Sequence, residues 1–251
     1  MQIKTDGLVI RELNVGESDR IITILTREKG VVRASAKGAR IPKNRFASVC
    51  RLLCFSRFTL FAGRGKYIID EAEPLDVFIG LRGSLSGLAL GQYFCELCGA
   101  VAPQEEPAEP FLRLILNALH LLETGSRPPT LVKAAFELRL LTLAGYMPDL
   151  VACRGCGAYE QDTMYLLPVT GCQMCADCLR EKSVREAAMP LSKGALAAMR
   201  HAVYSDFERL FSFSLPEPAL EQLSEAAEAS LVSQLERSFA TLEFYRNVRD
   251  V

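Results

Sequence analysis

The spacing of hydrophobic residues along the chain changes once, near residue 77. Before that point, short runs rich in β-branched and aromatic residues alternate with turn-forming stretches such as NVGESD, REKG and AGRGK. Runs of this kind are typical of β-strands. The sequence therefore predicts five short strands that form a small barrel, with the sequences LVIREL, RIITILT, VVRASAK, LLCFSRFTLF and YIIDEAE.

The third of these runs alternates small or apolar residues with polar ones, as a strand with one packed face requires. We expect Val32, Ala34 and Ala36 to face the core, and Arg33, Ser35 and Lys37 to face outward.

From Phe78 onward the apolar residues recur at intervals of three and four, which predicts helices. The helical stretches are LSGLALGQYFCELCGAV, PFLRLILNALHLLE and LVKAAFELRLLTLAGY, followed after a cysteine-rich segment by LSKGALAAMRHAVYS and PALEQLSEAAEASLVSQLERSFATLEFY. The predicted fold class is α+β, a barrel followed by a helical domain that carries an insert. The expected boundaries are residues 1–77 for the barrel, 78–149 and 183–251 for the helical domain, and 150–182 for the insert.

Charge is sorted along the chain although the net charge is only -1. From Arg20 to Lys66 there are 12 basic residues and a single acid, Glu28. Such a segment repels itself unless a polyanion neutralises it, so it indicates a nucleic-acid surface. The alternative interpretation is a solvated basic face without a partner.

Five of the nine cysteines lie between Cys153 and Cys178. Two C-x-x-C pairs separated by 15 to 20 residues are typical of a four-cysteine zinc site. Cys153 and Cys156 form the first pair, and the second is either Cys172 with Cys175 or Cys175 with Cys178. Spacing alone leaves both choices open. We expect one structural Zn²⁺, because catalytic zinc keeps an open position and usually has a histidine or carboxylate ligand.

The remaining cysteines and the histidines fit no second metal site. Cys95 and Cys98 lie in an apolar helical run, and Cys50 and Cys54 flank strand-like residues, so we expect all four to pack in the core. His120 is interpreted as an ordinary helix residue.

No enzyme motif is found. The chain has no phosphate-binding G-x-x-x-x-G-K-[ST], no G-x-S-x-G and no H-x-E. We expect no catalytic residues. It also has no apolar run long enough to span a membrane, and its start has no pattern of an export signal, so we expect a cytoplasmic, nucleoid-associated protein.

Several stretches, in this order, resemble the RecO family of bacterial recombination-mediator proteins. They are GLVIRELNVGESDRIITILTREKG, AKGAR, YFCELC, FELRLLTLAGYMPDLVACRGCG and GCQMCADC. The family usually has two glycines, then two residues, before the second C-x-x-C, so Cys172 stands where the second glycine is expected. The resemblance thus implies that Cys153, Cys156, Cys175 and Cys178 are the zinc ligands.

The resemblance also implies an N-terminal OB-fold, and a function in DNA repair. Proteins of this family bind single- and double-stranded DNA, anneal strands, engage the C-terminal tail of single-stranded DNA-binding protein, and join RecR to help load RecA at gaps. OB-folds bind strands on the face of strands two and three and the loop between strands four and five. The residues predicted to contact DNA are Arg33, Lys37, Arg40, Lys43, Arg45, Arg64 and Lys66.

Two further expectations concern less specific patterns. Phe46, Phe55 and Tyr67 are either base-stacking neighbours of the basic segment or core residues. Lys133 and Arg139, beside apolar residues of one helix, are candidates for binding the acidic tail of single-stranded DNA-binding protein, and the alternative is a core helix. The alternative functions are an RNA-binding or ribosome-associated OB-fold protein and an enzyme without a recognisable motif.

Overall fold

The computed structural model describes residues 2–63, 66–182 and 184–249. They form two compact units, one from residues 1–124 and 239–251 and the other from residues 125–238. The domain boundaries predicted from the sequence stay predictions. Among the helices in the described part of the chain, none is long and apolar enough to cross a membrane.

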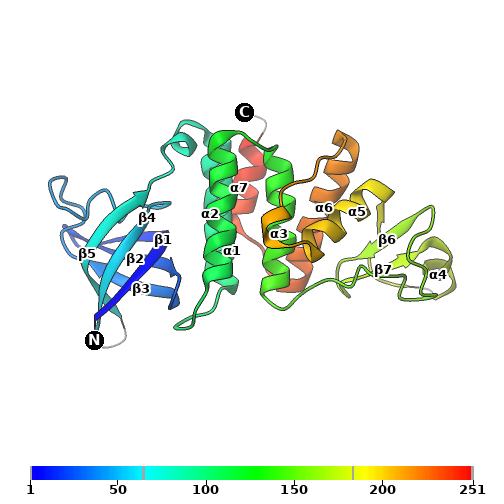
Figure 1. Cartoon of the computed structure of the whole chain (residues 1–251), viewed down its shortest axis with the longest axis horizontal. Helices are drawn as coiled ribbons and strands as arrows, with labels where there is room; N and C mark the ends of the chain where they lie inside the picture. The colour runs from blue at the N-terminus through cyan, green and yellow to red at the C-terminus, as the bar shows by residue number, and fades with distance from the viewer. Residues whose placement is uncertain (1, 64–65, 183, 250–251) are drawn as a thin grey trace. The chain divides into compact units, whose positions relative to one another are not determined.

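Five strands of the first unit form a closed barrel in the order β1-β2-β3-β5-β4 (Figure 1). Closure leaves the barrel without exposed strand edges. β3 pairs with β5 in parallel through Ala34 and Ser35, and the other neighbours are antiparallel. The five predicted strands are confirmed as β1 (Gln2–Val15), β2 (Asp19–Thr26), β3 (Gly30–Ala36), β4 (Phe55–Ala62) and β5 (Tyr67–Asp76).

The predicted alternation of β3 is confirmed. Val32, Ala34 and Ala36 are buried in the barrel core, and Arg33 is exposed. The predicted fourth strand begins too early, because Leu53 has a left-handed φ of 63° that strand residues do not adopt.

A long connection, residues 37–54, joins β3 to β4 through a series of turns. It packs Phe46, Val49 and Cys50 into the barrel core and exposes most of its charged side chains. The connection therefore belongs to the folded barrel and does not extend freely from it.

The first unit also contains three helices (Figure 1): α1 (Leu85–Val101) and α2 (Glu109–Thr124) follow the barrel along the chain, and α7 (Ala240–Val248) packs against α1. A short 3-10 helix, Ile79–Gly83, precedes α1. Gly30, at the start of β3, has a φ of 56°, and the N–H of Val31 donates to the carbonyl of Pro103 at 2.8 Å. A Cβ at Gly30 would lie 2.1 Å from that carbonyl oxygen, so only glycine allows this contact between the barrel and the α1–α2 connection.

The second unit contains three longer helices and the insert. α3 (Pro129–Leu143), α5 (Lys193–Tyr204) and α6 (Glu217–Leu235) pack on one another, with a 3-10 turn at Phe207–Arg209. The insert has a sheet in the order β7-β6-β8, and a short helix. β6 (Met164–Leu167), β7 (Cys172–Cys175) and α4 (Ala176–Glu181) lie within the predicted bounds of the insert, and β8 (Met189–Leu191), beyond those bounds, completes its sheet.

The last predicted helical stretch contains a break that its pattern does not mark. α6 ends at Leu235, where Glu236 follows with a left-handed φ of 48°, and α7 begins at Ala240. Phe239, in the break, is buried and its ring meets that of Tyr93 edge-on at 6.2 Å. The break thus ends one unit and starts the return of the chain to the other.

Candidate nucleic-acid interface and metal centre

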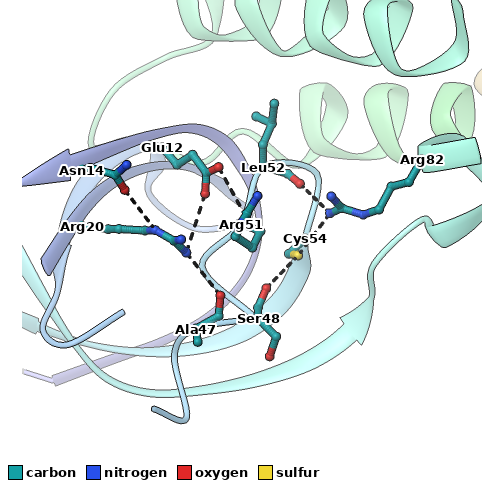
Figure 2. A network of polar contacts seen from close by, with 9 residues as sticks. All are labelled: Glu12, Asn14, Arg20, Ala47, Ser48, Arg51, Leu52, Cys54 and Arg82. Atoms are coloured by element: carbon teal, nitrogen blue, oxygen red, sulfur yellow. Dashed lines mark hydrogen bonds and ion pairs between the residues drawn. The ribbon is translucent and has the colours of Figure 1, made fainter. Parts of the chain in front are cut away.

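A polar network ties the 37–54 connection to the first two strands (Figure 2). Glu12 of β1 forms ion pairs with Arg20 of β2 at 3.9 Å and with Arg51 of the connection at 3.4 Å. Arg20, only 9% exposed, also donates to the side chain of Asn14 at 3.4 Å and to the carbonyl of Ala47 at 3.2 Å. These two arginines therefore hold the connection in place, and they share the single carboxylate of Glu12.

The far end of the connection is held in the same network (Figure 2). Arg82 donates to the carbonyl of Leu52 at 3.0 Å and approaches the sulfur of Cys54 at 3.9 Å. The thiol of Cys54 in turn lies 3.2 Å from the carbonyl oxygen of Ser48. Side chains from both β1 and the segment before α1 thus fix residues 47–54.

Asp19 anchors the other end of the connection. Its carboxylate accepts from the N–H of Gly38 at 2.8 Å and from the hydroxyl of Ser18 at 2.9 Å. The bond from Gly38, followed by that from Ser18, holds the pKa of Asp19 below its usual value. The carboxylate is consequently ionised beside the basic residues, and Lys37 lowers the pKa further.

The structure describes eleven of the twelve basic residues between Arg20 and Lys66, and ten of them fall into two groups; the other, Lys29, is half-buried. Arg20, Arg27, Arg51 and Arg57 form ion pairs with acids of the same unit. Six others are exposed and have no ion pair in the part of the chain that the structure describes: Arg33, Lys37, Arg40, Lys43, Arg45 and Lys66. These six are residues that the sequence predicted to contact DNA. The seventh, Arg64, lies outside the described residues.

Two of the six are oriented by hydrogen bonds to backbone carbonyls. The guanidinium of Arg40 donates to the carbonyl of Gly16, and the backbone N–H of Arg40 donates to the carbonyl of Ser18 at 2.9 Å. Arg45 donates to the carbonyl of Asp70 at 2.6 Å and lies over the ring of Phe46 at 4.7 Å. A guanidinium held by a neutral carbonyl keeps its positive charge, so both remain able to attract a phosphate.

The three candidate aromatic residues differ in burial. Phe46 is buried in the barrel core, where its alternative interpretation placed it. Phe55 is half-buried, and Tyr67 packs on the core while its hydroxyl donates to Glu105 at 2.6 Å. That bond, together with burial, raises the pKa of Tyr67 to about 12. Phe46 therefore belongs to the core, while base stacking by Phe55 or Tyr67 stays a prediction.

Four cysteines of the insert form a cluster. The sulfurs of Cys153, Cys156, Cys175 and Cys178 all lie within 4.8 Å of one another, and those of Cys156 and Cys175 are 3.8 Å apart. Tetrahedral zinc at 2.3 Å from each sulfur places the sulfurs about 3.8 Å apart. These four thiols therefore fit a single metal ion.

Local backbone geometry prepares this cluster for an ion. Burial acts to raise the pKa of the Cys153 thiol, but N–H groups of Cys175, Cys156 and Gly155 donate to its sulfur and lower the pKa to about 6. Gly155 allows the turn to approach the second pair, because a Cβ there would lie 2.6 Å from both the Cβ and the sulfur of Cys178. The cluster thus depends on a glycine as well as on the thiols.

Cys172 stands outside the cluster. Its sulfur lies 3.2 Å from the hydroxyl of Thr170 and 3.7 Å from a guanidinium nitrogen of Arg154. Of the two pairings that spacing leaves open, only Cys175 with Cys178 has both sulfurs in the cluster, and the zinc ligands stay a prediction.

The other cysteines and the histidines fit their predicted positions. Cys50, Cys54, Cys95 and Cys98 are buried, and burial raises the pKa of Cys50 to about 12. His120 is exposed on α2, and the Nε2 atom of His201 lies 2.7 Å from the carbonyl oxygen of Arg209.

Lys133 and Arg139 lie inside the second unit, 3% and 8% exposed. Lys133 forms ion pairs with Glu137 at 2.9 Å and Glu228 at 2.7 Å. Arg139 donates to the carbonyls of Ala202 at 3.1 Å and Ser205 at 2.7 Å. Both side chains therefore lie as expected for a helix of the core, the alternative given in the sequence analysis. Binding of the tail of single-stranded DNA-binding protein by Lys133 and Arg139 stays a prediction.

Two family models match the chain. The one described as "Recombination protein O N terminal" matches residues 1–78, and the one described as "Recombination protein O C terminal" matches residues 82–243. Together they cover both the barrel and the helical units.

Curated relatives match along almost the whole length. A DNA repair protein RecO from Acetivibrio thermocellus is 34% identical over 246 residues, covering 98% of this chain and 97% of the relative. A DNA repair protein RecO from Symbiobacterium thermophilum is 36% identical over 247 residues, covering 97% of this chain and 96% of the relative. One from Dehalococcoides mccartyi is 29% identical over 247 residues, covering 98% and 96%. The barrel, the cysteine cluster and these matches agree, and the chain belongs to the RecO family.

Proposed function

We propose that this chain acts in DNA recombination and repair as a mediator that binds DNA through phosphate contacts on its barrel. The observation that carries the proposal is the group of six exposed cations, Arg33, Lys37, Arg40, Lys43, Arg45 and Lys66, which form no ion pairs in the described residues. Leaving so many like charges unneutralised on one small barrel is unfavourable unless a polyanion binds there. The relatives named DNA repair protein RecO support DNA as that polyanion.

Contacts to phosphates would bind single and double strands of any sequence. A protein that holds two strands by their backbones leaves their bases free to pair, which is what strand annealing requires. The mediator role would also include binding the tail of single-stranded DNA-binding protein, joining RecR, and helping RecA to load at gaps. No catalytic step is part of this role.

One structural Zn²⁺, held by Cys153, Cys156, Cys175 and Cys178, is the cofactor that the sulfur spacing supports. Four thiolates would complete its coordination and leave no position for a reacting water. The ion would stabilise an insert whose own sheet has three short strands.

Binding assays with three nucleic acids test the function. Fluorescence anisotropy with single-stranded DNA, duplex DNA and structured RNA of matched length should show binding to both DNA forms. Addition of single-stranded DNA-binding protein to the DNA should still allow the chain to associate and to anneal complementary strands. Clear preference for structured RNA, with no annealing of DNA, would favour the alternative of an RNA-binding or ribosome-associated OB-fold protein.

A further inference from the structure

β1 contains a bulge that changes which way its side chains point. Val9 pairs with Ile24 and Arg11 pairs with Thr23, although only one residue step separates Ile24 from Thr23. Ile10 is therefore the extra residue of β1 at this position. Bulges turn the following side chains of a strand and occur often beside functional sites.

The bulge places Arg11 on the outside of the barrel. Val9 is buried in the barrel core, and side chains two positions apart on a regular strand share a face. Arg11 would then point into the core with Val9, but after the bulge its side chain is exposed. Glu12 now takes the inward position and pairs with Arg20 (Figure 2).

The pairing of β1 with β2 and of β2 with β3 places Arg11 in line with Arg33, a residue of the proposed DNA surface. Arg11 of β1 lies opposite Thr23 of β2, which lies opposite Arg33 of β3. Neighbouring strands are 4.7–4.9 Å apart, so the Cα atoms of the two arginines are about 10 Å apart with a threonine between them. Arg11 and Arg33 are both exposed and Thr23 is half-buried.

The next row of paired residues on the same face has two aliphatic residues and one serine. Leu13 lies opposite Ile21, which lies opposite Ser35, and Leu13 is 49% exposed. Leu13 thus adds exposed apolar surface on the same face as the two arginines. The two rows contain no aromatic ring, so this face offers charge and aliphatic contact without a stacking platform.

From this register we infer that Arg11 is a further phosphate-contacting residue, and that single-stranded DNA crosses the outer face of β1, β2 and β3 from Arg33 to Arg11. The inference rests on the proposed DNA-binding function and extends its surface to a strand outside the basic segment. Charge complementarity favours a polyanion as the occupant, because the row Arg11, Thr23 and Arg33 has two cations and no acid. Leu13 and Ile21 would contact sugars and base edges, so binding should depend little on the base.

The test compares Arg11→Ala with Arg57→Ala in the full chain. Arg57 is a matched control because it is an exposed arginine of the same barrel, on β4, whose charge is paired with Asp6 at 2.9 Å. Anisotropy titrations of a labelled oligothymidylate at several NaCl concentrations give the slope of log affinity against log salt. Arg11→Ala should make this slope less steep by about 0.7 and weaken binding at low salt, because one phosphate contact is lost.

Arg11→Lys should retain the wild-type slope, since counterion release depends on the charge, and Arg57→Ala should retain it as well. Circular dichroism and melting temperature identify any variant that does not fold.

A wild-type slope and affinity in folded Arg11→Ala would overturn the inference. If replacement of Arg33, Lys37 and Lys43 still weakens binding in that case, the proposed function stands without Arg11; if it does not, both fail. Weakened binding of a protein partner by Arg11→Ala, with DNA binding unchanged, would likewise overturn the inference.

Discussion

Replacement of Lys133 by methionine should destabilise the second unit, because this lysine neutralises two acids inside it. Its ammonium group lies 2.9 Å from a carboxylate oxygen of Glu137 and 2.7 Å from one of Glu228. The side chains of Lys133, Glu137 and Glu228 are 4%, 0% and 22% exposed. Burial acts to lower the pKa of Lys133, but the two acids outweigh it and raise the pKa, so the lysine is charged.

Removing one member of a buried ion pair costs about 3 to 5 kcal/mol, because the remaining charge stays in a poorly solvated place. We expect a loss of this size for Lys133→Met, whose side chain fills a similar volume. The double variant Lys133→Met with Glu137→Leu should recover much of the loss, because the fully buried carboxylate is removed as well. The carboxylate of Glu228, at the edge, can still reach water.

Urea denaturation followed by circular dichroism, with hydrogen exchange of the α3 amides, measures the loss in the full chain. Exchange is needed because a chain with two compact units need not unfold in one step. Lys193→Met is the matched control in the same unit, since Lys193 is 60% exposed and pairs with Glu160 at 3.5 Å. An exposed pair of this kind contributes about 0 to 1 kcal/mol.

A loss below about 1 kcal/mol for Lys133→Met, equal to that of the control, would refute the assignment of a buried structural lysine. If the same variant also lost affinity for the tail peptide of single-stranded DNA-binding protein while its stability was unchanged, Lys133 would be a partner-binding residue as the sequence suggested.

Three further predictions concern the metal centre. Metal analysis of purified Cys172→Ser should still give one zinc per chain, while Cys178→Ser should lose it; the opposite result would show that Cys172 is a ligand. Gly155→Ala should weaken zinc retention against a chelator, because its Cβ would lie 2.6 Å from the sulfur of Cys178, whereas Gly194→Ala, with its nearest neighbour at 3.7 Å, should not. Removal of the metal should increase hydrogen exchange in residues 150–191 and leave the barrel and its affinity for DNA unchanged; loss of DNA binding on chelation would place a DNA contact at the insert.

Much of the fold follows from patterns that involve only neighbouring residues. The alternation in β3 and the three- and four-residue spacing in α1 depend on local periodicity, which the sequence displays directly. The spacing of Cys153 and Cys156 similarly predicts half of the cysteine cluster. The choice between Cys172 and Cys178 needed either family resemblance or the coordinates, because both fit the spacing.

Other features depend on partners far along the chain, which periodicity does not reveal. Lys133 resembles a surface cation until Glu228, 95 residues later, is placed beside it. The bulge at Ile10 is visible only from the pairing of β1 with β2, so Arg11 was not among the predicted DNA contacts. The sequence of the basic segment likewise shows its total charge, but it does not show which of its arginines form ion pairs with Glu12, Asp6 or Glu109.

DNA binding through phosphate contacts on the barrel is tested most directly by the salt dependence of binding in the triple variant Arg33→Ala, Lys37→Ala and Lys43→Ala. These three exposed side chains form no hydrogen bond or ion pair in the residues that the structure describes, so their removal should leave the barrel folded. Each neutralised phosphate contributes about 0.7 to the slope of log affinity against log salt for single-stranded DNA. We expect the triple variant to have a slope less steep by about 2 and an unchanged melting temperature. Wild-type affinity and slope in the folded triple variant, for oligonucleotides of several sequences, would contradict this expectation.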